Sequence, residues 1–501
     1  MAANIFTGVT DSNWGTATNW SQGTVPTAID THVTTFDATS PNCTVDASDR
    51  FCNILNFNGY TNVITMTYSI SVSGNITLDS TMASRVSGSG GLKVNTSATL
   101  TSNGGTWNNS FTFAGTSQTY VLADNWNILG TLLLSGSILT TINGLFSLNV
   151  SGGITLTGYT IGTASIVMNG TGTIITTGAV LAINLTINTA GTITISGNFN
   201  YGSGTLTYIA GTVVTTGSSL DAYFTGSFNC SGITWNNISF NGIAQTYTLL
   251  SDLNLTGTLA TGGTTSLIIN GSNINCGGSL LTTNSPIGTT NFIMNGTGSV
   301  TTTGSTISVN LTINTAGTIT MVGTVNYSTG TLTYIAGTVV TTSSTLNITS
   351  SSVLNTNGIN WNNVTISTGT INLNSLLTVN GTLAVGSSGT VTFAGTSGFT
   401  CGTFSCVTAG RTINYAVGKT YLVTNSLIIT GTSVSRISFV STSTGALFNL
   451  QVGASQSVTN CNATWINSSG GQTIYSNPSV LINTTNWSKS NGFITWFNSQ
   501  F

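Results

Sequence analysis

The stretch TLTYIAGTVVTT, at Thr205–Thr216, returns letter for letter at Thr331–Thr342, 126 positions later. A second block, NLTINTAGTIT, occupies Asn184–Thr194 and returns at Asn310–Thr320 with the same offset. A chain that repeats itself over this distance indicates a repeat architecture, in which each unit buries its apolar face against its neighbours.

Apolar and small polar residues alternate in and around these blocks, as in TLTYI at 205–209 and ITMTYSISV at 64–72. Alternation with a period of two is typical of strands with one buried face. The 60 glycines and the many β-branched residues disfavour helix. Because 39% of the residues are hydrophobic, the chain can bury a core, and we do not expect it to be disordered.

The repeats and the composition divide the chain into six expected segments. Trp107-Asn108-Asn109 precedes Trp235-Asn236-Asn237 by 128 positions, which indicates a degenerate copy before the two clear ones. The segments are a Trp-rich cap at 1–60, a degenerate β repeat at 61–148, two clear copies at 149–274 and 275–400, loosened β coils at 401–460, and an aromatic cap or association segment at 461–501.

The repeat length favours an all-β fold of the parallel β-solenoid (β-helix) type with capped ends. Trp465 follows Trp361 by 104 positions, 22 fewer than the repeat offset. We interpret this as the loss of one coil, so that 126 residues correspond to six coils of about 21 residues. The alternative is a string of β-sandwich domains, because a sandwich also has about this length.

Charged residues make up only 3% of the chain, with nine Asp, no Glu, seven Lys or Arg, and a net charge of −2. This excludes a nucleic-acid interface, which needs clustered Lys and Arg. A surface without like-charge repulsion favours self-association. The chain has no apolar run long enough for a membrane helix, and its opening, MAANIFTGVTDSNW, predicts no signal peptide.

Few residues are available for catalysis. Glycoside-cleaving enzymes use paired carboxylates, and only Asp221 and Asp252 occur after Asp124. The positions 126 residues later hold Asn347 and Thr378, so an acid pair does not recur with the repeat. We therefore expect no enzyme, no catalytic residue and no cofactor.

Five aspartates gather in the first segment, and they could bind calcium or, as we favour, form turns. They are Asp11, Asp30, Asp37, Asp46 and Asp49. A single histidine, His32, cannot supply a zinc site, and we expect no metal. The seven cysteines are an odd number, which argues against a complete disulfide framework and favours small buried apolar side chains.

The text NWGTATNWSQGTVPTAID at 13–30 follows the pattern W…NWS-x-G-x-x-P-x-x-x-D. The matching residues are Trp14, Asn19, Trp20, Ser21, Gly23, Pro26 and Asp30. This segment resembles the opening of repetitive β-solenoid fibre and surface proteins of phages and bacteria, and 470–487 resembles their closing segment. The resemblance implies that the first segment caps an open strand edge, which would otherwise recruit other chains.

These observations predict a non-enzymatic structural subunit of a virion fibre or decoration, or of an extracellular filament, located on a virion or extracellular surface. The alternative is a glycan-binding adhesin or receptor-binding fibre, for which exposed aromatic rings such as Tyr208 and Tyr334 are candidates. A polysaccharide depolymerase is a remote alternative, which requires Asp221 and Asp252 to converge.

The expected partner is a further copy of the chain, in a homo-oligomer or filament. Glycans and other virion or cell-surface proteins are further candidate partners, without nucleic acid and without membrane insertion. The residues expected to make the association contacts are the tryptophans and phenylalanines of the two terminal segments: Trp14, Trp20, Trp487, Trp496, Phe497 and Phe501.

Overall fold

The computed structural model describes residues 1–136, 140–262, 266–269, 271–283, 287–386, 389–477 and 479–489. Within these ranges nearly every element is a short β-strand, and the only helices are the 3-10 helices η1 (Ala17–Asn19) and η2 (Ser80–Ser84). The expectation of almost no helix is therefore confirmed. Contacts divide the chain into two compact units, Met1–Asn254 and Leu255–Phe501.

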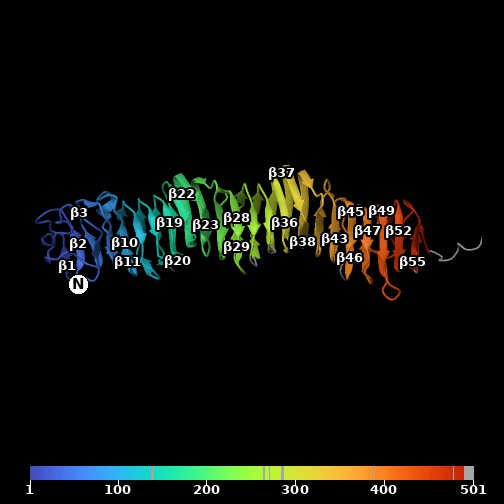
Figure 1. Cartoon of the computed structure of the whole chain (residues 1–501), viewed down its shortest axis with the longest axis horizontal. Helices are drawn as coiled ribbons and strands as arrows, with labels where there is room; N and C mark the ends of the chain where they lie inside the picture. Colours follow the sequence, from blue (N-terminus) through green and yellow to red (C-terminus); the bar gives the residue numbers. More distant parts are fainter. Residues whose placement is uncertain are drawn as a thin grey trace, which may run out of the picture. The chain divides into compact units, whose positions relative to one another are not determined.

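The N-terminal unit is a stack of coils in which each strand pairs in parallel with the strand one coil later (Figure 1). One column of paired strands consists of β1 (Ala3–Ile5), β2 (Val33–Asp37), β5 (Ile54–Asn58), β8 (Ile76–Thr77), β11 (Ala98–Thr101), β14 (Thr119–Leu122), β17 (Thr140–Asn143) and β20 (Thr160–Met168). A second column consists of β4 (Arg50–Cys52), β7 (Ile70–Val72), β10 (Leu92–Val94), β13 (Phe111–Phe113), β16 (Leu132–Leu134), β19 (Ile154–Leu156), β21 (Gly172–Thr176) and β22 (Leu181–Ser196). Parallel pairing between successive coils defines a β-solenoid and rules out the antiparallel sandwich alternative.

The register gives the coil length directly. Leu132 pairs with Ile154, Ile154 with Ile174, and Ile174 with Ile195, which are steps of 22, 20 and 21 residues. All four side chains are buried, because alternate residues of each strand point inward and stack on the coils above and below. The expected coil of about 21 residues is confirmed.

The C-terminal unit repeats this register at the offset seen in the sequence. Leu280 pairs with Val300 and Val300 with Met321, in β34 (Leu280–Thr282), β36 (Gly298–Thr302) and β37 (Ser308–Val322). The register shift after Ile187 in β22 recurs after Ile313 in β37. The same residues therefore impose the same coil geometry in both units.

Stacked asparagines connect successive coils on the polar faces. Asn149 donates from Nδ2 to Asn127 Oδ1 over 2.9 Å in the N-terminal unit. Asn347 donates to Asn326 Oδ1 over 2.8 Å in the C-terminal unit. Ladders of this kind pair polar side chains without charge, which explains how a chain with so few charged residues keeps its polar groups hydrogen-bonded.

The inferred loss of one coil after residue 400 is wrong. Trp361 is followed in its column by Val379, Cys401, Val423 and Val452. Trp465 lies outside that column, because the residue after it, Ile466, pairs with Phe448. The coils of this segment lengthen instead, and the step from Val423 to Val452 is 29 residues.

Candidate functional site

The residues predicted from the sequence to make association contacts lie in the two terminal regions, and these regions differ in structure. The N-terminal region is organised by four aromatic rings, those of Phe6, Trp14, Trp20 and Phe36. The ring centroids of Trp14 and Trp20 lie 4.9 Å apart, and Phe36 lies 5.5 Å from Trp14. All four side chains are buried, and Trp20 Nε1 donates to the Trp14 carbonyl oxygen over 2.8 Å. Aromatic packing of this kind gives a compact core to a segment with little regular structure.

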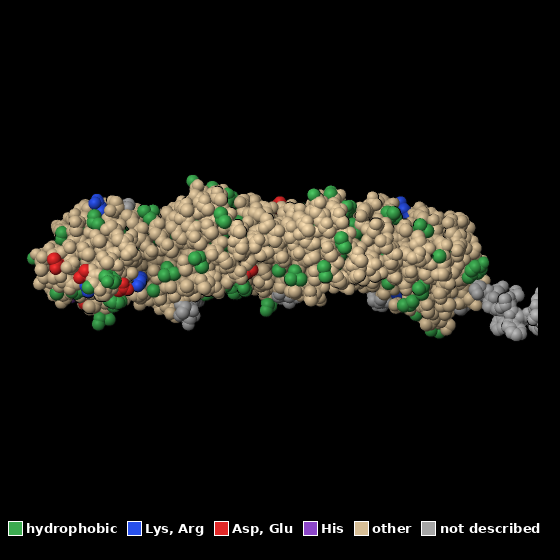
Figure 2. Space-filling view, turned by 45° about the horizontal axis from the view of Figure 1, so that its top comes forward, with side chains coloured by type: hydrophobic (Ala, Val, Ile, Leu, Met, Phe, Trp, Pro, Cys, Tyr) green, Lys and Arg blue, Asp and Glu red, His purple; other side chains and the backbone are tan. Residues whose placement is uncertain are grey.

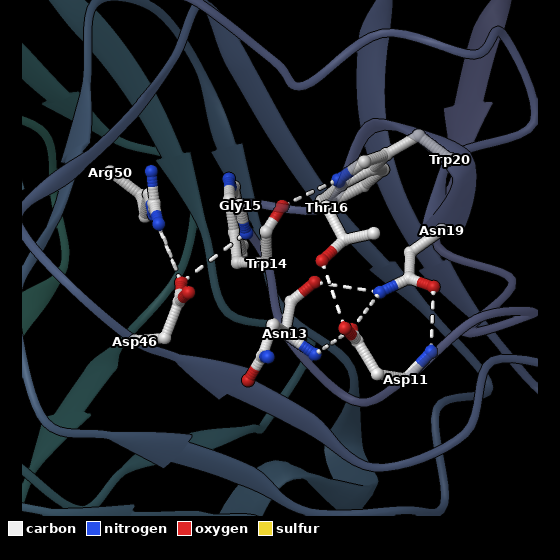
Figure 3. Close-up of polar contacts among 9 residues, drawn as sticks. All are labelled: Asp11, Asn13, Trp14, Gly15, Thr16, Asn19, Trp20, Asp46 and Arg50. Atoms are coloured by element: carbon white, nitrogen blue, oxygen red, sulfur yellow. Dashed lines mark hydrogen bonds and ion pairs between the residues drawn. The ribbon is translucent and has the colours of Figure 1, made fainter.

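Asp11 holds the loop between these tryptophans (Figure 3). Its carboxylate accepts hydrogen bonds from the Asn13 backbone N–H at 2.8 Å, from Asn19 Nδ2 at 2.6 Å and from Thr16 Oγ1 at 3.0 Å. The Asn13 N–H and the Asn19 amide lower the pKa of Asp11 below its ordinary value because they stabilise the charged form. Asp11 is thus a turn-forming aspartate, as expected.

The same loop covers the free edge of the first strand, β1. The Ser21 N–H donates to the Ile5 carbonyl oxygen at 2.9 Å, and the Ile5 N–H donates back to Ser21 Oγ at 2.8 Å. Phe6 and Trp20 form an antiparallel bridge, and Asn4 Nδ2 donates to the Thr24 carbonyl oxygen at 2.9 Å. The polar groups of this edge therefore have partners within the chain, and the expected cap is present.

Burial of the two indoles changes the interpretation of this region. Trp14 and Trp20 have exposed fractions of 0% and 2%, so their rings build the cap and offer no surface to a partner. If the N-terminal region associates, other side chains must make the contacts.

The remaining aspartates of the first coils also form local contacts. Asp46 pairs with Arg50 at 2.6 Å and Asp49 pairs with Lys93 at 2.8 Å. Asp37 Oδ1 accepts from the Thr39 and Ser40 backbone N–H groups, at 2.9 and 3.1 Å. Within the described ranges, no cluster of three or more metal-ligating side chains occurs. The carboxylates are therefore used in turns and ion pairs.

Asp221 is the buried acid of the N-terminal unit, with an exposed fraction of 6%. It lies in β25 (Ser219–Ala222), between Asn200 on one coil and Ser239 on the next. Burial raises the pKa of Asp221, and a hydrogen bond from Ser219 opposes this in part. At its position in the stack, neither adjacent coil provides a second carboxylate, which a depolymerase of the expected type would need.

The C-terminal region ends differently. The last coil contains β55 (Ser479–Thr485), which pairs with β53 (Cys461–Asn467). In the described part of the chain, no strand pairs with the other edge of β55. Val480 and Ile482 of this strand have exposed fractions of 42% and 47%. A strand edge without a partner is a template for pairing with another chain, and the two exposed apolar side chains lie on the outer face of the same strand.

Trp487 belongs to the packing of this last coil. Its exposed fraction is 7%, its Nε1 donates to Ser468 Oγ at 2.8 Å, and its ring lies 6.3 Å from that of Phe439. Trp487 therefore does not present the association surface expected of it. Trp496, Phe497 and Phe501 lie outside the described residues, and their role stays a prediction.

An open hollow of about 690 Å³ lies beside this last coil. Its lining is uncharged and includes Gln456, Ser469, Gln472, Thr473, Tyr475 and Asn486. Tyr475 lies in β54 (Ile474–Ser476), and its exposed fraction is 53%. Asn486 donates from Nδ2 to the Ser468 and Gly471 carbonyl oxygens, both at 3.0 Å, which fixes the hollow's shape.

The tyrosines proposed as an aromatic platform are held against the coil surface. Tyr208 donates to the Gly211 carbonyl oxygen and Tyr334 to that of Gly337, both at 2.7 Å. Each ring lies over a glycine of the next coil, Gly232 in the case of Tyr208. Both tyrosines are only partly exposed, so Tyr475 is the more accessible ring.

All seven cysteines are free and buried, which confirms the preferred interpretation of these residues as small apolar side chains. Burial raises the pKa of the Cys52 thiol to about 12, so this group stays protonated and unreactive at neutral pH. No helix in the described ranges is long and apolar enough to span a membrane.

The open edge of β55 and the exposed Tyr475 were not predicted from the sequence. Val480 and Ile482 flank Leu481, and they lie in register with Asn462 and Thr464, the outward residues of β53. Their exposure therefore follows from the face of the coil that they occupy. No protein-family model matches the chain, and no curated protein or solved structure matches it either.

Proposed function

We propose that this protein is a non-enzymatic structural subunit of a virion fibre or decoration, or of an extracellular filament, which assembles by self-association. The observation that carries the proposal is the difference between the two terminal strands. The edge of β1 is covered by residues of its own chain, whereas β55 has an edge without a described partner and exposes Val480 and Ile482 on its outer face. A chain whose first strand edge is covered, and whose last described strand has a free edge among the described residues, is suited to ordered growth.

The nearly uncharged surface supports the same proposal. Figure 2 shows a face covered mostly by uncharged polar side chains and backbone. Only 16 of the 501 residues are Asp, Lys or Arg, so long-range repulsion between copies is weak.

The proposal is tested by sedimentation velocity and negative-stain electron microscopy of the full chain at rising concentration. We expect regular assemblies that grow with concentration. The double variant Val480→Glu/Ile482→Glu should remain monomeric, because it places two charges on the strand that has the free edge. The matched control Ile209→Glu/Ile243→Glu changes two isoleucines that are 59% and 73% exposed elsewhere and should assemble normally. A wild-type protein that stays monomeric throughout would refute the proposal.

The segment after Lys489 gives a second test. Removal of residues 490–501 deletes Trp496, Phe497 and Phe501 but keeps Trp487, whose ring the last coil needs. We expect weaker assembly with an unchanged circular dichroism spectrum. Stronger assembly of the shortened chain would show that the segment protects the β55 edge, and it would contradict an associating role for these three residues.

The hollow beside the last coil favours a second candidate function, the binding of a neutral glycan. Amide and hydroxyl groups next to an exposed aromatic ring are suited to sugars, which present hydroxyls on their edges and C–H groups on their faces. Ser469, Gln472, Tyr475 and Thr485 are the exposed residues of the lining.

A panel of neutral oligosaccharides titrated against the full chain tests this candidate. Any glycan that binds should lose about tenfold in affinity on Tyr475→Ala, a loss typical of one aromatic contact. The control Tyr223→Ala removes a tyrosine that is 37% exposed in the N-terminal unit and should change nothing. Equal loss in both variants would place the site elsewhere.

A further inference from the structure

The two units carry opposite formal charges. Residues 1–254 contain all nine aspartates and three cations, Arg50, Arg85 and Lys93, which gives −6. Residues 255–501 contain no Asp or Glu and four cations, Arg411, Lys419, Arg436 and Lys489, which gives +4. The low net charge of the chain therefore conceals a strong asymmetry.

The first coils of the N-terminal unit present acidic groups beside exposed apolar ones. Of their five aspartates, Asp46 and Asp49 are paired with cations. Asp11, Asp30 and Asp37 make no ion pair among the described residues, and they accept hydrogen bonds from neutral groups of their own turns. Val9 and Ile29, close to them in the chain, have exposed fractions of 78% and 90%.

The last coils of the C-terminal unit present basic groups beside exposed apolar ones. Lys489 ends β56 (Trp487–Lys489), and it pairs in register with Ser476, the neighbour of the exposed Tyr475. Arg436, directly before β50 (Ile437–Ser441) and two coils before β55, donates to Asn462 Oδ1 at 3.4 Å. Because this unit has no Asp or Glu, neither cation has an acidic side chain of the unit to pair with.

We infer that copies of this chain associate head to tail, with the last coil of one copy bound to the first coils of the next. The inference rests on the proposed self-association and names the partner surface. Contact between two acidic or two basic ends would be repulsive, whereas contact between unlike ends pairs opposite charges. Such a heterologous contact leaves one donor and one acceptor end free, so it extends into an open chain or closes into a ring.

Two full-length variants, each blocked at one end, test this polarity. The triple variant Asp11→Asn/Asp30→Asn/Asp37→Asn removes three charges, and the amide oxygen can still accept the hydrogen bonds of each turn. Its control, Asp79→Asn/Asp124→Asn/Asp221→Asn, removes three charges further along the same unit. The second blocked variant is Val480→Glu/Ile482→Glu. Circular dichroism establishes that all of them are folded.

Head-to-tail association predicts that each blocked variant alone stays monomeric. A mixture of the two should form 1:1 dimers, because the intact last coil of one variant can bind the intact first coils of the other. Sedimentation velocity measures these species. Wild-type assembly should also weaken by about tenfold between about 0.05 M and about 0.5 M NaCl. The control triple variant should assemble as the wild type does.

Assembly of the aspartate-to-asparagine variant at the wild-type concentration would overturn the inference, because it would mean that the β55 edge pairs with another β55 edge. Absence of 1:1 dimers in the mixture would overturn it too. In both cases the proposed self-association would survive, because the wild type still assembles. A monomeric wild type would instead refute the proposed function itself.

Discussion

The N-terminal and C-terminal units are built from the same coil but differ in how their terminal coils are finished and in which charges they carry. The first coil is closed by an aromatic core and by hydrogen bonds to the edge of β1. The last coil leaves β55 with one described partner. The comparison teaches that the geometry of the coils follows from the apolar repeat. Whether the strand at each end is covered depends on a few residues outside that repeat.

The largest expected effect breaks the closed end. Trp14→Ala should lower the free energy of unfolding of the first coils by about 3–5 kcal/mol, because it removes a fully buried ring from the aromatic core. Coils of a solenoid are stabilised mainly by their neighbours, so hydrogen exchange should rise in residues 1–60 and stay unchanged beyond about residue 149.

The matched control is Trp487→Ala in the last coil. That ring has one aromatic neighbour, Phe439, and lies at an edge that is already open, so its loss should affect fewer coils. If Trp14→Ala destabilised the whole chain equally, the stability of the coils would not be local, and the comparison between the ends would fail.

A smaller expected effect is a difference between the two units in their stability in acid, which depends on their carboxylates. Hydrogen bonds from the Thr81 and Gly59 backbone N–H groups lower the pKa of Asp79, and the hydrogen bond from Lys93 lowers that of Asp49. A carboxyl whose pKa is lowered in the folded state contributes its full stability above the ordinary aspartate pKa. This stability is lost as the pH falls from that value through the lowered pKa. The N-terminal unit should therefore lose on the order of 1 kcal/mol below about pH 4, after allowance for solvent screening.

The C-terminal unit contains no Asp or Glu, so acid should leave it nearly unaffected. Protection factors for hydrogen exchange, measured at about pH 7 and about pH 3, would distinguish the two units. A protection factor is already a ratio to the intrinsic exchange rate, so the change of that rate with pH cancels. Equal loss of protection in both units would contradict the assignment of acid sensitivity to the aspartate turns.

The solenoid could be predicted from the sequence because the spacing of its apolar and polar side chains has the period of the coil. Alternating apolar residues and a long repeat determine which residues point inward, and the steps from Ile154 to Ile174 and Ile195 follow from them. The inference of a lost coil was wrong because it assumed that Trp465, as a tryptophan, occupies the same position in its coil as Trp361. Its backbone φ of +61° lies in the left-handed region, which marks a bend within β53 between the part that pairs with β50 and the part that pairs with β51 (Phe448–Val452), unlike the extended position of Trp361.

The association residues were harder to predict, because exposure is decided by tertiary context. Trp14, Trp20 and Trp487 were chosen as aromatic residues of the terminal segments, and all three are buried. Large aromatic side chains stabilise cores and interfaces by the same burial, so residue type alone does not distinguish the two roles. The exposed Val480 and Ile482 resemble the inward residues of other coils in type, but they lie in the outward row, in register with Asn462 and Thr464.

The smallest expected effect compares one position in the two units. Asp221 lies beside Asn200, whose Oδ1 is buried without a hydrogen-bond donor, whereas the equivalent Asn347 donates to Asn326 Oδ1 at 2.8 Å. Asp221→Asn should complete the same ladder and remove a buried charge, which should stabilise the coil by about 1 kcal/mol at neutral pH.

The pH dependence identifies the cause of that gain. Burial raises the pKa of Asp221, so the wild-type stability from this group is present at low pH and is lost as the pH rises through the raised value. The advantage of Asp221→Asn should therefore be largest at neutral pH and shrink in acid, where the wild-type carboxyl is protonated and can donate to Asn200 itself. The reverse change, Asn347→Asp, should destabilise its coil with the same pH dependence, as measured by local hydrogen exchange. A gain from Asp221→Asn that does not change with pH would mean that shape, not ionisation, distinguishes the two positions.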